Sequence, residues 1–135
     1  MWNKADAGFQ TIDLVTTEVY VMTTNFTAGL LNGFSYVGGN LTSQVAGVYN
    51  AKARFSIASA GTSEYGMKLF INGVGQNNCY SHIHTVVNRE NEMNVDCLVT
   101  LTVGQNLNVG FDDHTGAPND ITLKSGNVNL IRIGN

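Results

Sequence analysis

Apolar and polar residues alternate along most of the chain, and the alternation is clearest over residues 49–57. The apolar positions of this stretch are Tyr49, Ala51, Ala53, Phe55 and Ile57. Neighbouring side chains of a β-strand point to opposite faces of the sheet. A period of two therefore predicts a strand with one buried side and one exposed side.

The same pattern recurs further along the chain. It predicts strands over residues 67–71, 95–103 and 107–111, and shorter β-favouring runs lie at 12–22 and 34–37. Residues 128–133 are apolar on both faces, which is typical of a central or interface strand. Asn72-Gly73 and Gly104 end two of the runs as turn signals. No stretch keeps helical spacing over three turns, so we predict an all-β jelly-roll β-sandwich of eight or nine antiparallel strands.

The chain length predicts a single domain. Its 135 residues suffice for one hydrophobic core, so we assign residues 1–135 to one unit. Residues 1–8 are expected to form an N-terminal arm. Trp2 lies in that arm, and we expect it to pack against another chain, because aromatic side chains anchor well in a partner's pocket.

The charge content is low, and this narrows the range of partners. Charged residues make up 13% of the chain, about half of the usual ~25%. The net charge is −3, and the five cations from Lys52 to Lys124 are scattered. A nucleic-acid surface needs clustered cations, and a membrane span needs about 18 apolar residues in a row. We therefore expect no nucleic-acid or membrane partner. The low charge also suggests that part of the surface is covered in an assembly, or that the protein lies outside a cytoplasm.

The order of the strands and turns resembles a known family. Gly47-Val48-Tyr49 leads into the long alternating strand, and Leu69–Gly73 ends in Asn-Gly. Cys97–Val109 gives a strand, a glycine turn and a further strand, and an apolar run closes the chain at Leu130–Ile133. Over residues 34–133 this arrangement resembles the jelly rolls of tumour necrosis factor and the complement globular heads. It is most similar to their phage relatives, the fibre heads and capsid decoration proteins.

The resemblance implies a tight homotrimer formed around apolar strand faces. Two features depart from the family. Gly104-Gln105 stands where the family turn usually has Gly-Asp, and the first 30 residues match no member.

Two histidines and a cysteine form the first candidate site. If residues 88–91 are a hairpin loop, Cys97 lies opposite His82 and Val95 lies opposite His84, all on one face. His82, His84 and Cys97 are soft ligands that suit Zn²⁺. A fourth ligand is missing, so hydrogen-bonded histidines on a core or subunit face are the favoured interpretation. The expected subunit interface comprises Trp2, Tyr80, His82, His84 and Val99, and no cofactor is expected.

The same hairpin register predicts two free thiols. Cys79 would face Thr100, on the opposite face from Cys97. Side chains that point apart cannot form a disulfide without movement of the backbone.

The segment 112–120 is the second candidate, because its three aspartates could provide oxygen ligands for Ca²⁺. Its spacing matches no calcium loop, so a polar turn is favoured. Asp113 and His114 are an acid–base pair only in sequence, because adjacency does not create a catalytic triad. The chain has no nucleophile, zinc-protease or phosphate-binding motif. We predict that it is not an enzyme.

These observations lead to three functional hypotheses. The first is a non-enzymatic viral structural protein, a capsid decoration (cement) protein. It would sit as a homotrimer on the outer capsid surface of a bacteriophage virion and bind the major capsid protein. Binding only the assembled shell would stabilise the phage head. The alternative is the receptor-binding head of a phage tail fibre, which would bind a host receptor or glycan; the lack of a stalk repeat favours decoration. The third is a secreted cytokine-like or lectin-like module.

Overall fold

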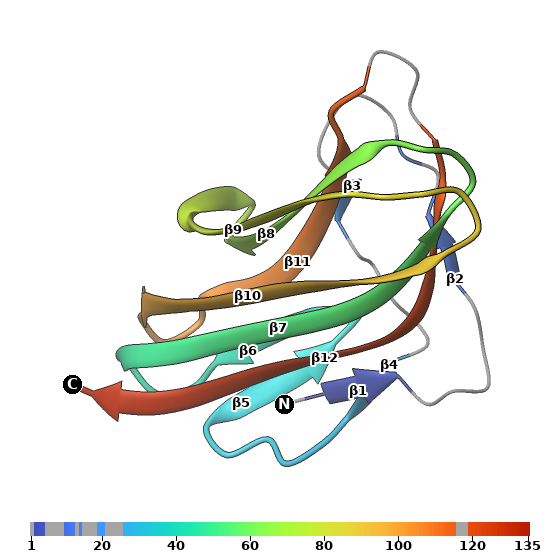
Figure 1. The fold of residues 1–135 in the computed structure, drawn as a ribbon. Coiled ribbons are helices and arrows are strands. Elements are labelled where there is room, and N and C mark those ends of the chain that lie inside the picture. Colours follow the sequence, from blue (N-terminus) through green and yellow to red (C-terminus); the bar gives the residue numbers. More distant parts are fainter. Residues whose placement is uncertain (1, 5–9, 13, 15–18, 21–25, 116–118) are drawn as a thin grey trace.

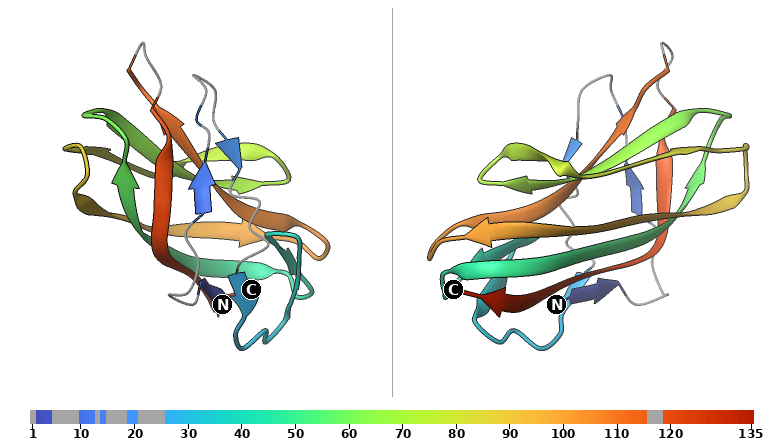
Figure 2. Two further views of the ribbon diagram at one scale, coloured as in Figure 1. Left: turned by 90° about the vertical axis from the view of Figure 1, so that its right-hand side faces the viewer. Right: turned by 60° about the vertical axis from the view of Figure 1, so that its left-hand side comes forward.

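Two antiparallel sheets make up the part of the chain that the structure describes. The computed structural model describes residues 2–4, 10–12, 14, 19–20, 26–115 and 119–135. The two sheets pack face to face (Figures 1 and 2). No helix in these ranges is long and apolar enough to cross a bilayer. The predicted all-β jelly-roll sandwich is confirmed.

The first sheet has the strand order β10-β7-β12-β1-β4, with β2 paired to β12. Its strands are β1 (Trp2–Lys4), β2 (Gln10–Ile12), β4 (Phe26–Ala28), β7 (Gly47–Ser59), β10 (Glu90–Leu101) and β12 (Ile121–Gly134). The second sheet has the order β5-β6-β11-β8-β9, with β3 paired to β11. Its strands are β3 (Val19–Tyr20), β5 (Phe34–Val37), β6 (Asn40–Ser43), β8 (Glu64–Ile71), β9 (Val74–His84) and β11 (Asn106–Asp113).

The structure describes twelve strands, more than the eight or nine predicted, because it includes four very short strands near the N-terminus. Strands β1 to β4 have two or three residues each. The backbone of Trp2 pairs with both Val128 and Ala28. Residues 2–4 of the predicted arm therefore add a strand to the first sheet. The predicted burial of the Trp2 side chain and the path of residues 5–8 lie outside the described part of the chain.

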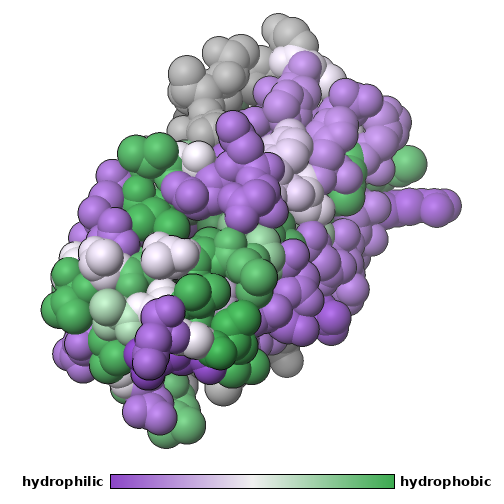
Figure 3. Space-filling view, turned by 90° about the vertical axis from the view of Figure 1, so that its left-hand side faces the viewer, coloured by the Kyte–Doolittle hydropathy of each residue, from purple (hydrophilic) through white to green (hydrophobic). Residues whose placement is uncertain are grey.

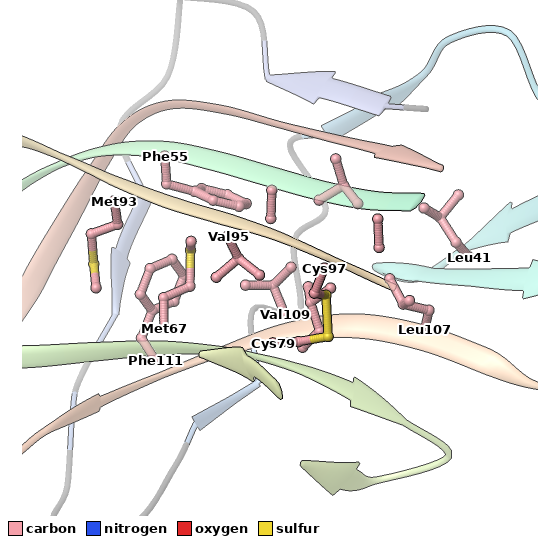
Figure 4. Packing of buried hydrophobic residues seen from close by; sticks show 14 of the residues in the cluster. Leu41, Phe55, Met67, Cys79, Met93, Val95, Cys97, Leu107, Val109 and Phe111 are labelled. Atoms are coloured by element: carbon pink, nitrogen blue, oxygen red, sulfur yellow. A yellow bond between two sulfur atoms is a disulfide. The ribbon is translucent and has the colours of Figure 1, made fainter. Parts of the chain in front are cut away.

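The core forms where the inward residues of the two sheets meet. Alternate residues of β7, from Tyr49 to Ile57, are at most 2% exposed. Phe55 of the first sheet packs edge-on against Phe111 of the second, with ring centroids 5.3 Å apart (Figure 4). The predicted turn at Asn72-Gly73 is confirmed, since both residues have positive φ angles, 50° and 80°. Asparagine and glycine are the residues that best tolerate such angles.

The predicted pairing of residues 79–87 with 93–103 is wrong. β9 pairs with β8 in the second sheet, whereas β10 pairs with β7 in the first. The connection between β9 and β10 crosses from one sheet to the other, and Thr85 is buried in it beside Ser59, with hydroxyl oxygens 2.9 Å apart.

The prediction of two free thiols fails with that register. Cys79 on β9 and Cys97 on β10 both point into the core and form a disulfide between the sheets (Figure 4). Their Cα atoms are 5.4 Å apart, within the range that a disulfide requires. Because β10 and β9 are the edge strands of their sheets, the disulfide joins the two sheets along one edge of the sandwich.

Candidate functional site

The outer face of the first sheet is built from the residues that alternate with the core positions of three neighbouring strands, β10, β7 and β12. Cross-strand pairing arranges them in rows. We call this set the first-sheet face. It consists of Leu98, Asp96 and Asn94 on β10, Asn50, Lys52 and Arg54 on β7, and Ile131, Asn129 and Asn127 on β12. The inward neighbours fill the core, so these nine side chains lie on the outer side of the sheet.

The middle of the first-sheet face is polar and pairs internally. Lys52 Nζ lies 2.9 Å from the Asp96 carboxylate, and Arg54 Nε donates to Asn94 Oδ1 at 2.9 Å. The hydrogen bond from Lys52, with a smaller contribution from Asn50, holds the pKa of Asp96 below its ordinary value. A shallow groove of about 370 Å³ runs between these side chains and Asn127. Lys52 and Asp96 compensate each other's charge, whereas Arg54 adds one positive charge to the groove.

One end of the first-sheet face is apolar instead. Leu98 and Ile131 flank Asn50 on neighbouring strands, and they are 53% and 58% exposed. Ile133, near the end of β12, is 57% exposed. Apolar side chains gather visibly at this end of the sandwich (Figure 3). A cavity of about 430 Å³ opens beside them, lined in part by Val45 and Ile131. An apolar surface of this kind often marks an interaction site.

The polar residue Asn50 lies between Leu98 and Ile131 in this apolar end. Its Oδ1 atom is buried, and no donor within the described chain reaches it. A buried acceptor without a donor costs about 1–3 kcal/mol. This oxygen is inaccessible from outside, so a partner docked on the face does not reach it. The exposed Leu98 and Ile131 are therefore what marks this end as an interaction surface.

The structure separates the predicted metal ligands. Cys97 lies in the core disulfide, whereas His82 and His84 project outward from β9 in the second sheet. The prediction that the three share one face is therefore wrong, because their strands belong to different sheets. Val99 is only 5% exposed and packs in the core, so it does not share a surface with Tyr80. Within the described residues, no three histidine, cysteine or carboxylate side chains already converge as metal ligands.

The segment 112–120 contributes to both the interior and the surface of the second sheet. Asp113 is 3% exposed, and its carboxylate accepts hydrogen bonds from Ser63 Oγ, from the amide and hydroxyl of Thr115, and from the amide of Asn119. Burial alone would raise the pKa of Asp113, but these hydrogen bonds lower it overall. Its oxygens are thus used within the chain, which favours the polar-turn interpretation over a Ca²⁺ loop.

His114 points the other way from Asp113. Its Nε2 lies 2.5 Å from the Tyr80 hydroxyl and 3.0 Å from Asp112 Oδ2, on the outer face of the second sheet. Adjacent positions on a strand face opposite sides, so His114 and Asp113 do not act together. The Ser63–Asp113 hydrogen bond therefore has no histidine beside it to make a catalytic triad.

Comparison with solved structures shows the fold. A TNF from S. frugiperda, Eiger, superposes with a TM-score of 0.73 at 10% identity, covering 98% of this chain and 90% of that one. The chain has the jelly-roll fold of the tumour necrosis factor and C1q heads. The globular domain of zebrafish complement 1qA gives 0.64 at 16% identity, covering 99% and 98%. Murine APRIL gives 0.58 at 12% identity, covering 91% and 96%. No family description and no curated protein matches the sequence.

Sequence reasoning missed the residues that give each outer face its character. Leu98 was assigned to an alternating strand, and Ile131 to a strand with the pattern of a central or interface strand, but the two were not brought together. His114 was placed in a loop apart from His82. The signal that could have found them is parity, because residues on a strand share a face when they are an even number of positions apart. Using that signal requires knowing which strands are neighbours.

Proposed function

We propose that this chain is a non-enzymatic assembly module that forms a homotrimer through the first-sheet face. The observation that carries the proposal is the apolar end of that face, where Leu98, Ile131 and Ile133 are each more than half exposed. In a threefold arrangement, one edge of this surface on each chain contacts a different edge of it on the next chain. Three such contacts close into a ring.

The energetics favour a second copy of the chain as the partner. Fully burying a leucine or isoleucine side chain contributes about 1.5–3 kcal/mol. Leu98, Ile131 and Ile133 are each more than half exposed, so their burial in three copies would contribute substantially to association. Lys52 and Asp96 compensate each other's charge, so Arg54 is the one charge without a carboxylate partner among the nine residues of the face.

The test is the oligomeric mass of the protein and of charge variants. Leu98→Asp and Ile131→Asp place a carboxylate in the apolar end, and we expect each to shift the trimer to monomer. Val37→Asp is the matched control, because Val37 is 75% exposed on β5 of the other sheet. A wild-type monomer at all concentrations, or a trimer in both face variants, would refute the proposal.

We further propose the outer capsid surface of a virion as its place, where it would act as a decoration protein bound to the major capsid protein. The sequence resemblance to phage decoration proteins and the low charge content support this placement. The Cys79–Cys97 disulfide fits it, because disulfides persist on virion surfaces and outside cells. The alternative, a tail-fibre head that binds a host receptor or glycan, fits the disulfide equally well.

Copy number separates these two placements. Quantitative mass spectrometry of purified particles would count this chain against the major shell protein. Hundreds of copies support decoration, whereas a few to a few tens support a fibre head. If the chain is absent from particles, both viral placements are wrong.

A further inference from the structure

The chain contains two Asn-Gly pairs, Asn32-Gly33 and Asn72-Gly73, and both lie in turns. Each glycine has a φ angle of 80°. In such a pair, the amide nitrogen of the glycine can attack the side chain of the asparagine, because glycine has no side chain of its own to hinder the approach. The sequence alone therefore makes the two asparagines equally open to this reaction, but their surroundings in the fold differ.

The side chain of Asn72 is held in place. Its Oδ1 atom accepts a hydrogen bond from the Asn106 amide at 2.9 Å, and the Asn72 amide donates to the Asn106 carbonyl at 2.9 Å. Asn106 is fixed in turn, since its own Oδ1 accepts from the Thr42 hydroxyl at 2.6 Å. Rotation of the Asn72 side chain toward the nitrogen of Gly73 breaks the bond to Asn106, and this slows the attack.

The side chain of Asn32 is exposed, and it is not held in this way. Among the described residues, neither that side chain nor the amide of Gly33 forms a hydrogen bond. The turn itself is anchored beside them, because the Gly33 carbonyl accepts a hydrogen bond from the Gln44 amide at 2.8 Å. Asn32 can therefore rotate toward a neighbouring nitrogen that no other group occupies.

We propose that Asn32 is a site of spontaneous deamidation. The Gly33 amide nitrogen loses its proton and forms a bond to Cγ of Asn32. The bond from Cγ to the side-chain nitrogen breaks, and ammonia leaves with that proton, so a cyclic succinimide remains. Water then opens either C–N bond of the ring and leaves aspartate or isoaspartate. The net change consumes one water, releases ammonium and converts a neutral amide into a carboxylate.

The new charge would lie beside the apolar end of the first-sheet face. Asn32 lines the cavity of about 430 Å³ together with Val45, Ile131 and Arg132. Arg132 Nε already donates to the Ala46 carbonyl at 3.1 Å. Covering a carboxylate costs more free energy than covering an amide, so deamidation should weaken association slowly and irreversibly. This consequence rests on the proposed trimer, whereas the reaction itself takes place within one chain.

Peptide mass spectrometry of untagged protein aged in mildly alkaline buffer tests the proposal. Trypsin separates the two sites, because Asn32 lies in the peptide of residues 5–52 and Asn72 in that of residues 69–89. In the folded chain, we expect Asn32 to convert at least about fivefold faster than Asn72, the factor that one hydrogen bond provides. In the reduced chain unfolded in urea, the two rates should become similar. Asn32→Gln is the control, since its longer side chain cyclises far more slowly.

The same measurement on Leu98→Asp separates this proposal from the proposed trimer. A trimer that covers the cavity would slow the reaction of Asn32 in wild type, and Leu98→Asp should restore it. If Asn32 converts no faster than Asn72 in both proteins, or if unfolding leaves the ratio of the two rates unchanged, the proposal is overturned. Fast conversion of Asn32 in a protein that is monomeric throughout would support the deamidation site and refute only the trimer.

Discussion

The outer faces of the two sheets follow the same alternating pattern but carry different chemistry. The first-sheet face has an ion pair, an asparagine-rich middle and an apolar end around Asn50. The outer face of the second sheet has all three histidines and their acidic partners. The inward residues of the two sheets are alike, because those of both sheets form one hydrophobic core. The outward positions therefore give each face its own chemistry, and the apolar end of the first-sheet face is where we propose that a second copy of the chain binds.

The Cys79–Cys97 disulfide joins the two sheets, and we expect its removal to lower the stability of the fold the most. Closing a loop of this size stabilises a fold by about 3 kcal/mol, so the Cys79→Ser/Cys97→Ser double variant should lose about that much unfolding free energy. Urea denaturation with and without reductant measures it. If wild-type stability is unchanged by reductant, the disulfide does not form in the protein.

Asp113 supports the second sheet from within, and its removal should have the next largest effect. Hydrogen bonds to a charged group are worth about 1.5–3 kcal/mol, so Asp113→Asn should cost about 1–3 kcal/mol at neutral pH. Asp120→Asn, at an exposed position of the same loop, should cost much less.

The pH dependence of stability should confirm the origin of that effect. The pKa of Asp113 is lowered in the folded protein. Its carboxylate therefore stabilises the fold above the unfolded-state pKa of about 3.9, and this contribution is lost as the pH falls through the lower folded-state pKa. The Asp113→Asn variant should show a flatter stability curve below about pH 4. An identical curve for variant and wild type would contradict this role.

Gly66→Ala should disturb the side chains on the outer face of the second sheet while leaving the first-sheet face intact. The added Cβ meets the ends of the Asp112 and Tyr80 side chains, which can swing outward. We expect the free energy of unfolding, measured by thermal denaturation, to change by no more than about 1 kcal/mol. The oligomeric mass should remain that of wild type. A larger loss of stability would show that Gly66 is needed for the fold itself.

Lys52→Ala should have the smallest effect on stability. It tests whether the polar middle of the first-sheet face takes part in association. Exposed ion pairs contribute about 0–1 kcal/mol, and Lys52 and Asp96 are each more than half exposed. We expect a change of at most that size in thermal stability, smaller still at high salt, and no loss of association. Dissociation by Lys52→Ala would move the contact from the apolar end to the polar middle.

The sequence predicted those features that depend on period and turn chemistry. The β7 strand follows directly from its alternating residues, and the Asn72-Gly73 turn follows from the backbone angles that these residues favour. The pairing of β9 was mispredicted, because a loop of five residues can either turn back within a sheet or cross to the opposite one. Residues 85–89 cross, and Thr85 is buried on the way.

That single difference explains the errors at the candidate sites. A crossing connection turns Cys79 and Cys97 toward each other, and it removes Cys97 from the neighbourhood of His82. The partner of His82 is instead His114, 32 positions away on a strand that is not adjacent to β9. Such a contact depends on the strand order of the sheet, which local alternation does not encode.

The solution mass of the untagged protein tests the central claim most directly. Multi-angle light scattering across a concentration series should give three times the chain mass of 14.5 kDa for wild type and for Val37→Asp. Leu98→Asp should give the mass of one chain with an unchanged circular dichroism spectrum. A wild-type mass of one chain throughout, or a trimeric Leu98→Asp variant, would contradict the assignment of the first-sheet face as the assembly surface.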